Sequence, residues 1–198
     1  MTLIRFLISG AALLLLFAGV QAQGNAKHFA KDGLSFDYAN GWAITDQSTS
    51  DAQQLTLTRT DSEAQIRIFA HRGRVDTPEK MAQAKKAFID PYVAATNNQF
   101  VQMGAKPERS TASTEIGGAT AEGVRLRASL SGEAGEATIY WLALGNRAIV
   151  VTLFGPDKAL KRATTEWDTI RSSLKLELPP PPGKQPAPKP SPAPESHR

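Results

Sequence analysis

Residues 138–154 carry apolar side chains on both faces of an extended pattern. The segment divides at Gly145-Asn146, a dipeptide that suits a two-residue type II′ hairpin turn. With that turn, Trp141 lies opposite Val150, and the neighbouring pair on the other face is also apolar. A hairpin with no polar face belongs in the middle of a sheet that is covered on both sides. The rest of the chain therefore has to supply two covers.

The segment that follows Pro156 is predicted to form a helix that covers one face of the sheet. Pro156 opens it, and apolar residues then recur at steps of three and four, the spacing of one helix face. The apolar stripe consists of Leu160, Ala163, Trp167, Ile170 and Leu174. Charged residues, among them Glu166 and Asp168, occupy the remaining faces. We expect this helix to dock on the sheet through its stripe.

A second helix is predicted to begin at Thr77-Pro78-Glu79. These residues offer a capping hydroxyl, a proline at the first helical position and an acid near the positive end of the helix dipole. The predicted buried stripe is Met81, Ala84, Phe88 and Tyr92. Pro91 is expected to kink or divide the helix, because proline removes one hydrogen bond and crowds the preceding turn. Helical character is expected to extend to about Met103.

Alternating apolar and polar residues predict the other strands. The clearest pair is a hairpin in which Leu57 faces Ile66 and Leu55 faces Ile68. Shorter alternating segments are predicted at residues 34–38, 42–46, 109–116 and 124–130. The predicted fold class is α+β, with a largely antiparallel sheet of about six strands and two main helices packed on it.

The two ends of the chain differ from its middle. Residues 1–22 combine one basic residue, Arg5, with a short apolar run and an exit of small residues, the signature of a cleaved secretory signal peptide. The apolar run, about 15 residues, is shorter than the roughly 20 needed to span a bilayer. Residues 179–198 are dominated by proline and predict a disordered tail. A single domain is expected over residues 23–178, in a secreted protein of the periplasm or extracellular space without stable membrane insertion.

The charge of the predicted domain argues against nucleic acid as a partner. The whole chain has a formal net charge of +4, but residues 23–178 contain 19 basic and 18 acidic residues. A domain that holds a polyphosphate shows a concentrated positive charge. The chain also contains no cysteine, which excludes disulfides and a lipid-modified cysteine.

Three segments give the chain a resemblance to a known family. They are the entry strand GLSFDYANGW, the strand pair ATIYWLALGNRAIVVTLFG, and the final helix ending in EWDTIRSSLKL, with a long helix inserted after the second hairpin. In these features the chain resembles the PsbP-like superfamily, which includes the photosystem II extrinsic protein PsbP and related bacterial envelope proteins. The resemblance covers about residues 29–178. It implies a scaffold that mostly binds proteins, sometimes with a metal assisting, and is not generally catalytic.

The chain departs from that family in two places. Ala39-Asn40 stands where the family often has proline before the glycine-tryptophan pair, and the acylated cysteine of the envelope lipoproteins is missing. No functional residue of the family maps securely onto this chain. The resemblance therefore implies a fold and a class of role, and no site.

Catalytic and metal-binding patterns are weak in this sequence. His28 and His71 lie far apart in the chain, and a metal site between them stays a remote alternative. Glu133 and Glu136 fall in a predicted glycine-rich loop, where soluble turn residues are commoner than an acid–base pair or a calcium site. The Ser172–Lys175 segment matches a Ser-x-x-Lys motif without its partner motifs. We expect no catalytic residue, no metal and no cofactor.

Five residues are candidates for an interaction surface. Arg59, Arg67, Arg125 and Arg127 point away from apolar strand faces, and Phe69 points out among them. An arginine cluster recognises carboxylates or phosphates through its bidentate fork. The alternative is that these side chains only solvate one face of the sheet.

Two function classes follow from these observations. The leading hypothesis is a non-catalytic secreted protein that binds another protein or an envelope component. The alternative is an envelope enzyme whose site is assembled from scattered polar residues. A pocket lined by converging carboxylates or histidines would favour the enzyme, and a surface that combines arginine with aromatic residues would favour the binding protein.

Overall fold

A computed structural model describes residues 26–177 of the chain. The predicted signal peptide, residues 1–22, and the predicted tail, residues 179–198, both lie outside these residues. Three strands form a small sheet: β1 (Lys27–Lys31), β2 (Leu34–Tyr38) and β10 (Lys175–Leu176). Seven strands form a large sheet: β3 (Trp42–Asp46), β4 (Ala52–Arg59), β5 (Ser62–Arg74), β6 (Glu108–Ile116), β7 (Ala119–Leu130), β8 (Glu133–Leu144) and β9 (Arg147–Pro156). The helices are α1 (Pro78–Ala84), the π-helical turn η1 (Lys85–Ile89), α2 (Asp90–Gln102), α3 (Asp157–Arg162) and α4 (Thr164–Ser173).

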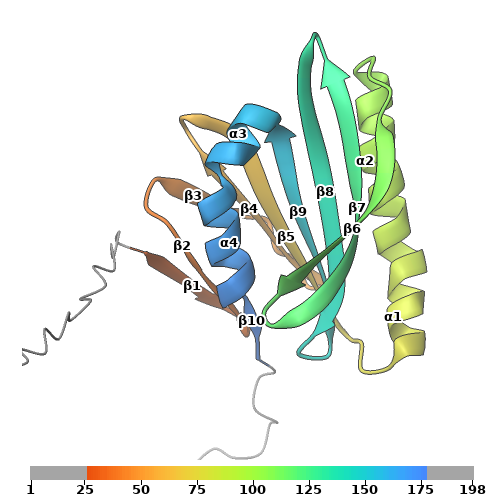
Figure 1. Cartoon of the computed structure of the whole chain (residues 1–198). Coiled ribbons are helices and arrows are strands. Elements are labelled where there is room, and N and C mark those ends of the chain that lie inside the picture. The colour runs from red at the N-terminus through yellow and green to blue at the C-terminus, as the bar shows by residue number, and fades with distance from the viewer. Residues whose placement is uncertain (1–25, 178–198) are drawn as a thin grey trace, which may run out of the picture.

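The large sheet has the strand order β3-β4-β5-β9-β8-β7-β6, and its neighbouring strands are all antiparallel. The long helix α1-η1-α2 lies along one of its faces (Figure 1). Helices α3 and α4 lie on the other face, with the small sheet beside them (Figure 1). One apolar core fills the space under α3 and α4, and a second fills the space under the long helix.

The β8–β9 hairpin lies at the centre of the large sheet, as the sequence predicts. Trp141 pairs with Val150, and the next pair is apolar as well. Val150 contributes to the core under the long helix, whereas Val151 contributes to the core under α4. The turn type was predicted wrongly. Gly145 and Asn146 both have positive φ values, 53° and 59°, which is the type I′ geometry that asparagine tolerates.

The predicted hairpin of residues 55–68 is confirmed in its register. Leu55 pairs with Ile68, and Leu57 pairs with Ile66. All four side chains are buried in the core under α4. The alternation of apolar and polar residues was sufficient to predict the register, because one face of the hairpin is apolar and the other polar.

The number of strands was underestimated. Within the described residues there are ten strands in two sheets, where about six in one sheet were expected. Strand β1 escaped prediction because Phe29 is its one large apolar residue, and β10 because it has only two residues. The turn at Asn40-Gly41 also separates the two sheets, since β2 pairs with β1 and β10 while β3 pairs with β4.

The long helix begins as predicted, with the Thr77 side chain accepting a hydrogen bond from the Lys80 backbone. Pro91 does not divide it. The π-helical turn precedes the proline, and the Asp90 N–H bonds to the Lys85 carbonyl five residues back. A wider turn at this point accommodates the missing N–H and the ring of the proline, so the helix continues to Gln102.

The π-helical turn also shifts the buried stripe by one residue. The sequence predicts Phe88 and Tyr92 in the stripe, but Ile89 and Val93 are the buried residues, at 0% and 3% exposure. Phe88 and Tyr92 are half-buried instead. This shift leaves two aromatic rings at the side of the helix, where they border the cleft described below.

The predicted stripe of the last helix is confirmed, since all five of its residues are buried. The helix is interrupted at Ala163, between α3 and α4. Trp167 stacks on Tyr140 of β8 with ring centroids 5.6 Å apart. Glu166 was expected on a polar face, but it is only 5% exposed.

We predict that Trp167→Ala destabilises the protein by about 3–5 kcal/mol, because it empties a buried aromatic site under α4. Asp168→Ala is the matched control. Asp168 is exposed and pairs with Arg171 at 2.8 Å, a surface contact worth at most about 1 kcal/mol. Urea unfolding of both variants measures the difference. Equal, small effects would show that the stripe does not anchor the helix.

Candidate functional site

The long helix covers only part of its face of the large sheet. Its core takes side chains from β7, β8 and β9. A helix is about 10 Å across and strands lie about 4.8 Å apart, so one helix covers roughly two or three strands. On this face the outer strands β3 and β4, and one side of β5, are therefore left without a helix over them.

Two rows of side chains cross this open half of the sheet. In the first row, Gln54 of β4 pairs with Phe69 of β5, which pairs with Val150 of β9. The second row contains Thr56, Arg67 and Thr152 on the same three strands. Residues paired in register point to the same face, so both rows face the side of the long helix.

The half-buried aromatic residues of the long helix form the wall of a cleft over these rows. Phe88 lies against Phe69, with ring centroids 5.4 Å apart. The Tyr92 hydroxyl and the Thr152 hydroxyl are 3.1 Å apart and share a hydrogen bond. The cleft between helix and sheet has a volume of about 460 Å³. That volume is within the range of small-molecule sites.

Arg67 is the one charged residue that lines this cleft within the described part of the chain. Its guanidinium donates a hydrogen bond to the side-chain oxygen of Gln65 at 3.1 Å. Across residues 26–177 it forms no ion pair with a carboxylate. The side chain is exposed and has N–H donors left for a ligand.

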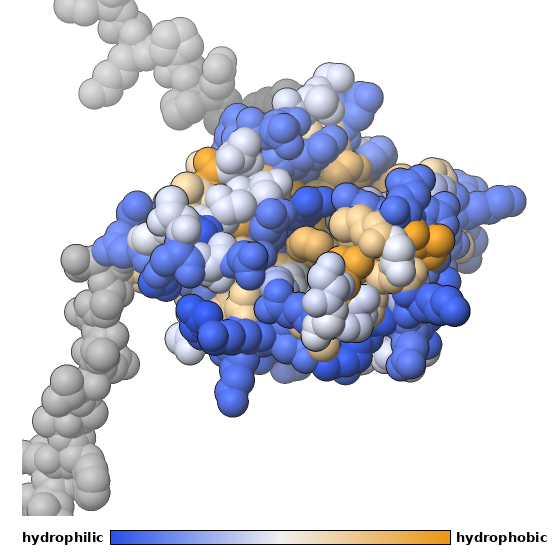
Figure 2. Space-filling model, turned by 90° about the horizontal axis from the view of Figure 1, so that it is seen from above, coloured by the Kyte–Doolittle hydropathy of each residue, from blue (hydrophilic) through white to orange (hydrophobic). Residues whose placement is uncertain are grey.

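The cleft continues past Arg67 toward one end of the molecule. A small hollow of about 40 Å³ shares Arg67, Tyr92 and Thr152 with the main cleft, and we call these three residues the waist. Beyond it lies an end hollow of about 250 Å³, lined by Phe100, Phe154 and other residues. Figure 2 views the molecule from this end and shows hydrophobic residues gathered among hydrophilic ones.

The five predicted surface residues do not share one surface, so that part of the prediction is wrong. Arg67 and Phe69 lie on the cleft face, whereas Arg125 and Arg127 lie on the face of α3 and α4. On that face both pair with Glu136, at 3.4 Å and 3.3 Å. The alternation of strands β5 and β7 explains the division, because their outward positions face opposite sides of the sheet.

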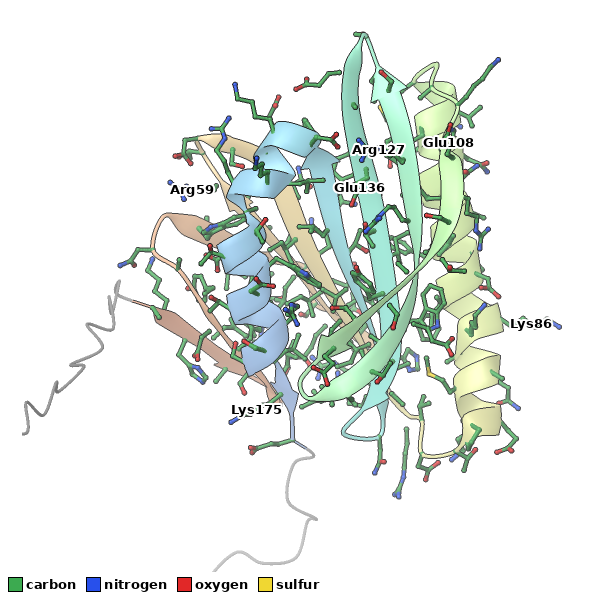
Figure 3. The ribbon with its side chains drawn as sticks, in the orientation of Figure 1. Arg59, Lys86, Glu108, Arg127, Glu136 and Lys175 are labelled. Atoms are coloured by element: carbon green, nitrogen blue, oxygen red, sulfur yellow. The ribbon has the colours of Figure 1, made fainter. Side chains whose placement is uncertain are left out.

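Arg59 stands apart from the other arginines. It pairs with Asp61 and borders a hollow beside α3. Figure 3 shows it across α3 from Arg127 and Glu136. A role for any of the five in binding stays a prediction.

The other candidates of the sequence have ordinary surroundings. His28 pairs with Asp37 at 2.6 Å, and His71 stacks on Phe88. Glu133 and Glu136 belong to strand β8 and face opposite sides, so the expected glycine-rich loop around them is wrong. Ser172 donates to a backbone carbonyl of its own helix. Within residues 26–177 no group of three or more His, Asp or Glu side chains could hold a metal.

Arg147 is a buried cation that the sequence did not mark as special. It is 6% exposed, and its guanidinium donates to the carbonyls of Ala70 and His71 and to the Gln53 side chain. Burial lowers the pKa of Arg147, and nearby Arg72 adds to the lowering. Because its donors are engaged with β4 and β5, Arg147 serves to join strands and is not free to bind a ligand.

Glu166 is the corresponding buried anion. Its carboxylate accepts a hydrogen bond from the Ala39 N–H at 2.9 Å, at the turn between the two sheets. Burial raises the pKa of Glu166, while the hydrogen bond and the charge of Arg59 oppose the rise. Perturbed carboxylates often mark active sites, but Glu166 lies on the face opposite the cleft.

Among the described residues, no helix is long and apolar enough to cross a membrane.

Comparisons with known proteins give a fold and no family. No family model and no curated protein matches the chain. A crystal structure from Bacteroides thetaiotaomicron VPI-5482 superposes with a TM-score of 0.51 at 15% sequence identity. The match covers 77% of this chain and 48% of that one, so the chain spans about half the length of that structure. At this identity the likeness shows a shared fold alone.

A second solved structure is the cyanobacterial PsbP, CyanoP, of Synechocystis sp. PCC 6803. It superposes with a TM-score of 0.49 at 13% identity, over 82% of this chain and 98% of that one. So low a TM-score carries no inference about this chain. Membership of the PsbP-like superfamily therefore stays a prediction.

We predict that the buried carboxylate of Glu166 makes stability fall as pH rises. Because its pKa is higher in the folded than in the unfolded state, the folded protein binds more protons from about pH 4.5, the ordinary value, up to the raised pKa. The glutamine of Glu166→Gln cannot ionise, so the variant loses this dependence of the free energy of unfolding on pH. Its free energy of unfolding minus that of the wild type should therefore increase with pH across this window.

Urea unfolding at a series of pH values measures that difference. The exposed Glu133→Gln variant controls for the loss of one negative charge. A stability difference for Glu166→Gln that falls with rising pH would contradict a raised pKa.

Proposed function

We propose that this chain is an exported, non-catalytic binding protein that holds its ligand in the cleft between the long helix and the open half of the sheet. The ligand is part of another protein or a component of the cell envelope. Export is proposed from the signal-peptide pattern of residues 1–22. The single observation that carries the proposal is the lining of the cleft, where one arginine stands among aromatic rings, amides and hydroxyls.

This lining favours binding over catalysis. Carboxylates and imidazoles, the usual general acids and bases, are missing from the cleft residues of the described chain. Phe69, Phe88 and Tyr92 offer apolar contact area, and aromatic residues and arginine are the types enriched where proteins bind partners. Gln54 and Thr56 offer neutral hydrogen-bonding groups beside them.

The structure of the cleft also supports a pre-formed site. Its floor is a hydrogen-bonded sheet, and its wall is held by Ile89 and Val93, which are buried in the core below. A cleft on rigid elements binds with little loss of conformational entropy. The proposal thus requires no rearrangement of the main chain.

Site-specific photocrosslinking in the cells that encode the protein tests the proposal. The crosslinker p-benzoylphenylalanine replaces exposed Gln54 at the border of the cleft or, as the matched control, exposed Lys161 on α3 at the opposite face. We expect an adduct from position 54 and none from position 161. Intact-mass measurement of the purified protein records a protein, lipid or glycan adduct alike. Adducts from position 161 alone, or none from either, would contradict the proposed site.

A further inference from the structure

We infer that the cleft binds a free anionic amphiphile, with its acidic group at Arg67 and its apolar body against Phe69, Phe88 and Val150. This inference rests on the proposed function, takes the ligand to be an envelope component and not part of another protein, and names its chemical class. The class covers small molecules with one carboxylate or similar anion and one continuous apolar chain.

The charge distribution selects the anion. Arg67 is the only charged group that lines the main cleft in the described chain, and no carboxylate of that region pairs with it. Arg127 shows the contrast, because it is already paired with Glu136 and Asp157. An arginine fork binds a carboxylate through two parallel hydrogen bonds.

The waist supplies further hydrogen-bonding groups for the same anion. Arg67, Tyr92 and Thr152 line both the main cleft and the small hollow beside it. The hydroxyls of Tyr92 and Thr152 are 3.1 Å apart, and one hydroxyl proton of the pair is not used between them. An anion at the waist thus meets a guanidinium and a hydroxyl donor.

The apolar body of the ligand finds apolar side chains to contact in the main cleft, on one side of the waist. Phe69 and Phe88 are half-buried, so part of each ring faces the cleft, and Val150 lies beside Phe69 in the sheet. The volume of about 460 Å³ suits one small molecule. It lies between a helix and a sheet, so a free molecule fits it better than a flat membrane surface does.

The end hollow beyond the waist carries negative charge. Glu63 and Glu133 line the end hollow together with apolar residues. Their charges repel an acidic group from the end hollow and so confine it to the waist, where Arg67 attracts it. The cleft and the end hollow therefore treat the acidic group and the apolar body of a ligand differently.

Fluorescence titration with dansylated undecanoate, and with the corresponding uncharged amide, tests the inference on the full-length protein. Arg67→Gln should weaken binding of the acid about tenfold or more and leave binding of the amide unchanged, because only the acid uses a charged hydrogen bond. Arg59→Gln removes the same charge outside the cleft and should change neither. Thr56→Trp places an indole in the cleft and should weaken both probes.

The possible failures are distinguishable. Equal binding of acid and amide, unaffected by Arg67→Gln, would overturn the anionic class but leave the proposed binding function in place. Absence of saturable binding by either probe would overturn the amphiphile altogether, while the crosslinking experiment still decides the proposed function. Sedimentation of the wild type with anionic phospholipid vesicles, lost in Arg67→Gln, would assign the site to a membrane and overturn a free ligand.

Discussion

The central hairpin β8–β9 places large apolar side chains on both faces of the large sheet, and the other layers exist to cover them. Tyr140 and Val151 are covered by α4, where Trp167 stacks on the Tyr140 ring. Trp141 and Val150 are covered by the long helix. Leaving either face in water would expose several side chains that each contribute about 1.5–3 kcal/mol when buried. Both helical layers therefore follow from one strand pair.

The two faces are covered unequally, and the cleft is the consequence. On one face α3, α4 and the small sheet together enclose a wide core. On the other face a single helix lies against seven strands, which is more than one helix can cover. The π-helical turn before Pro91 then turns Phe88 and Tyr92 toward the uncovered half. A backbone irregularity in a helix thus provides the aromatic wall of the proposed site, and such turns are frequent at functional sites.

The sequence predicted what depends on local periodicity and missed what depends on long-range placement. The hairpin registers and the Trp167 stripe were readable because each uses a regular spacing of apolar residues. The shift of the buried stripe from Phe88 and Tyr92 to Ile89 and Val93 could not be predicted, since no residue before Pro91 indicates a wider turn. Arg67 was identified as outward, but strand alternation alone could not tell that Arg125 and Arg127 point to the other face. Glu166 was expected to be solvated because its hydrogen-bond partner, the Ala39 N–H, lies more than a hundred residues away in the chain and no local pattern points to it.

The unequally covered sheet is proposed to create a ligand site on the cleft face. Amide chemical-shift mapping by NMR during titration with decanoate tests it most directly, because it locates binding without relying on a substitution. We expect shifts that saturate and cluster at residues 54–56, 67–69, 88–92 and 150–152, with α4 unaffected. Shifts that cluster on α3 and α4, or that spread evenly without saturation, would contradict it.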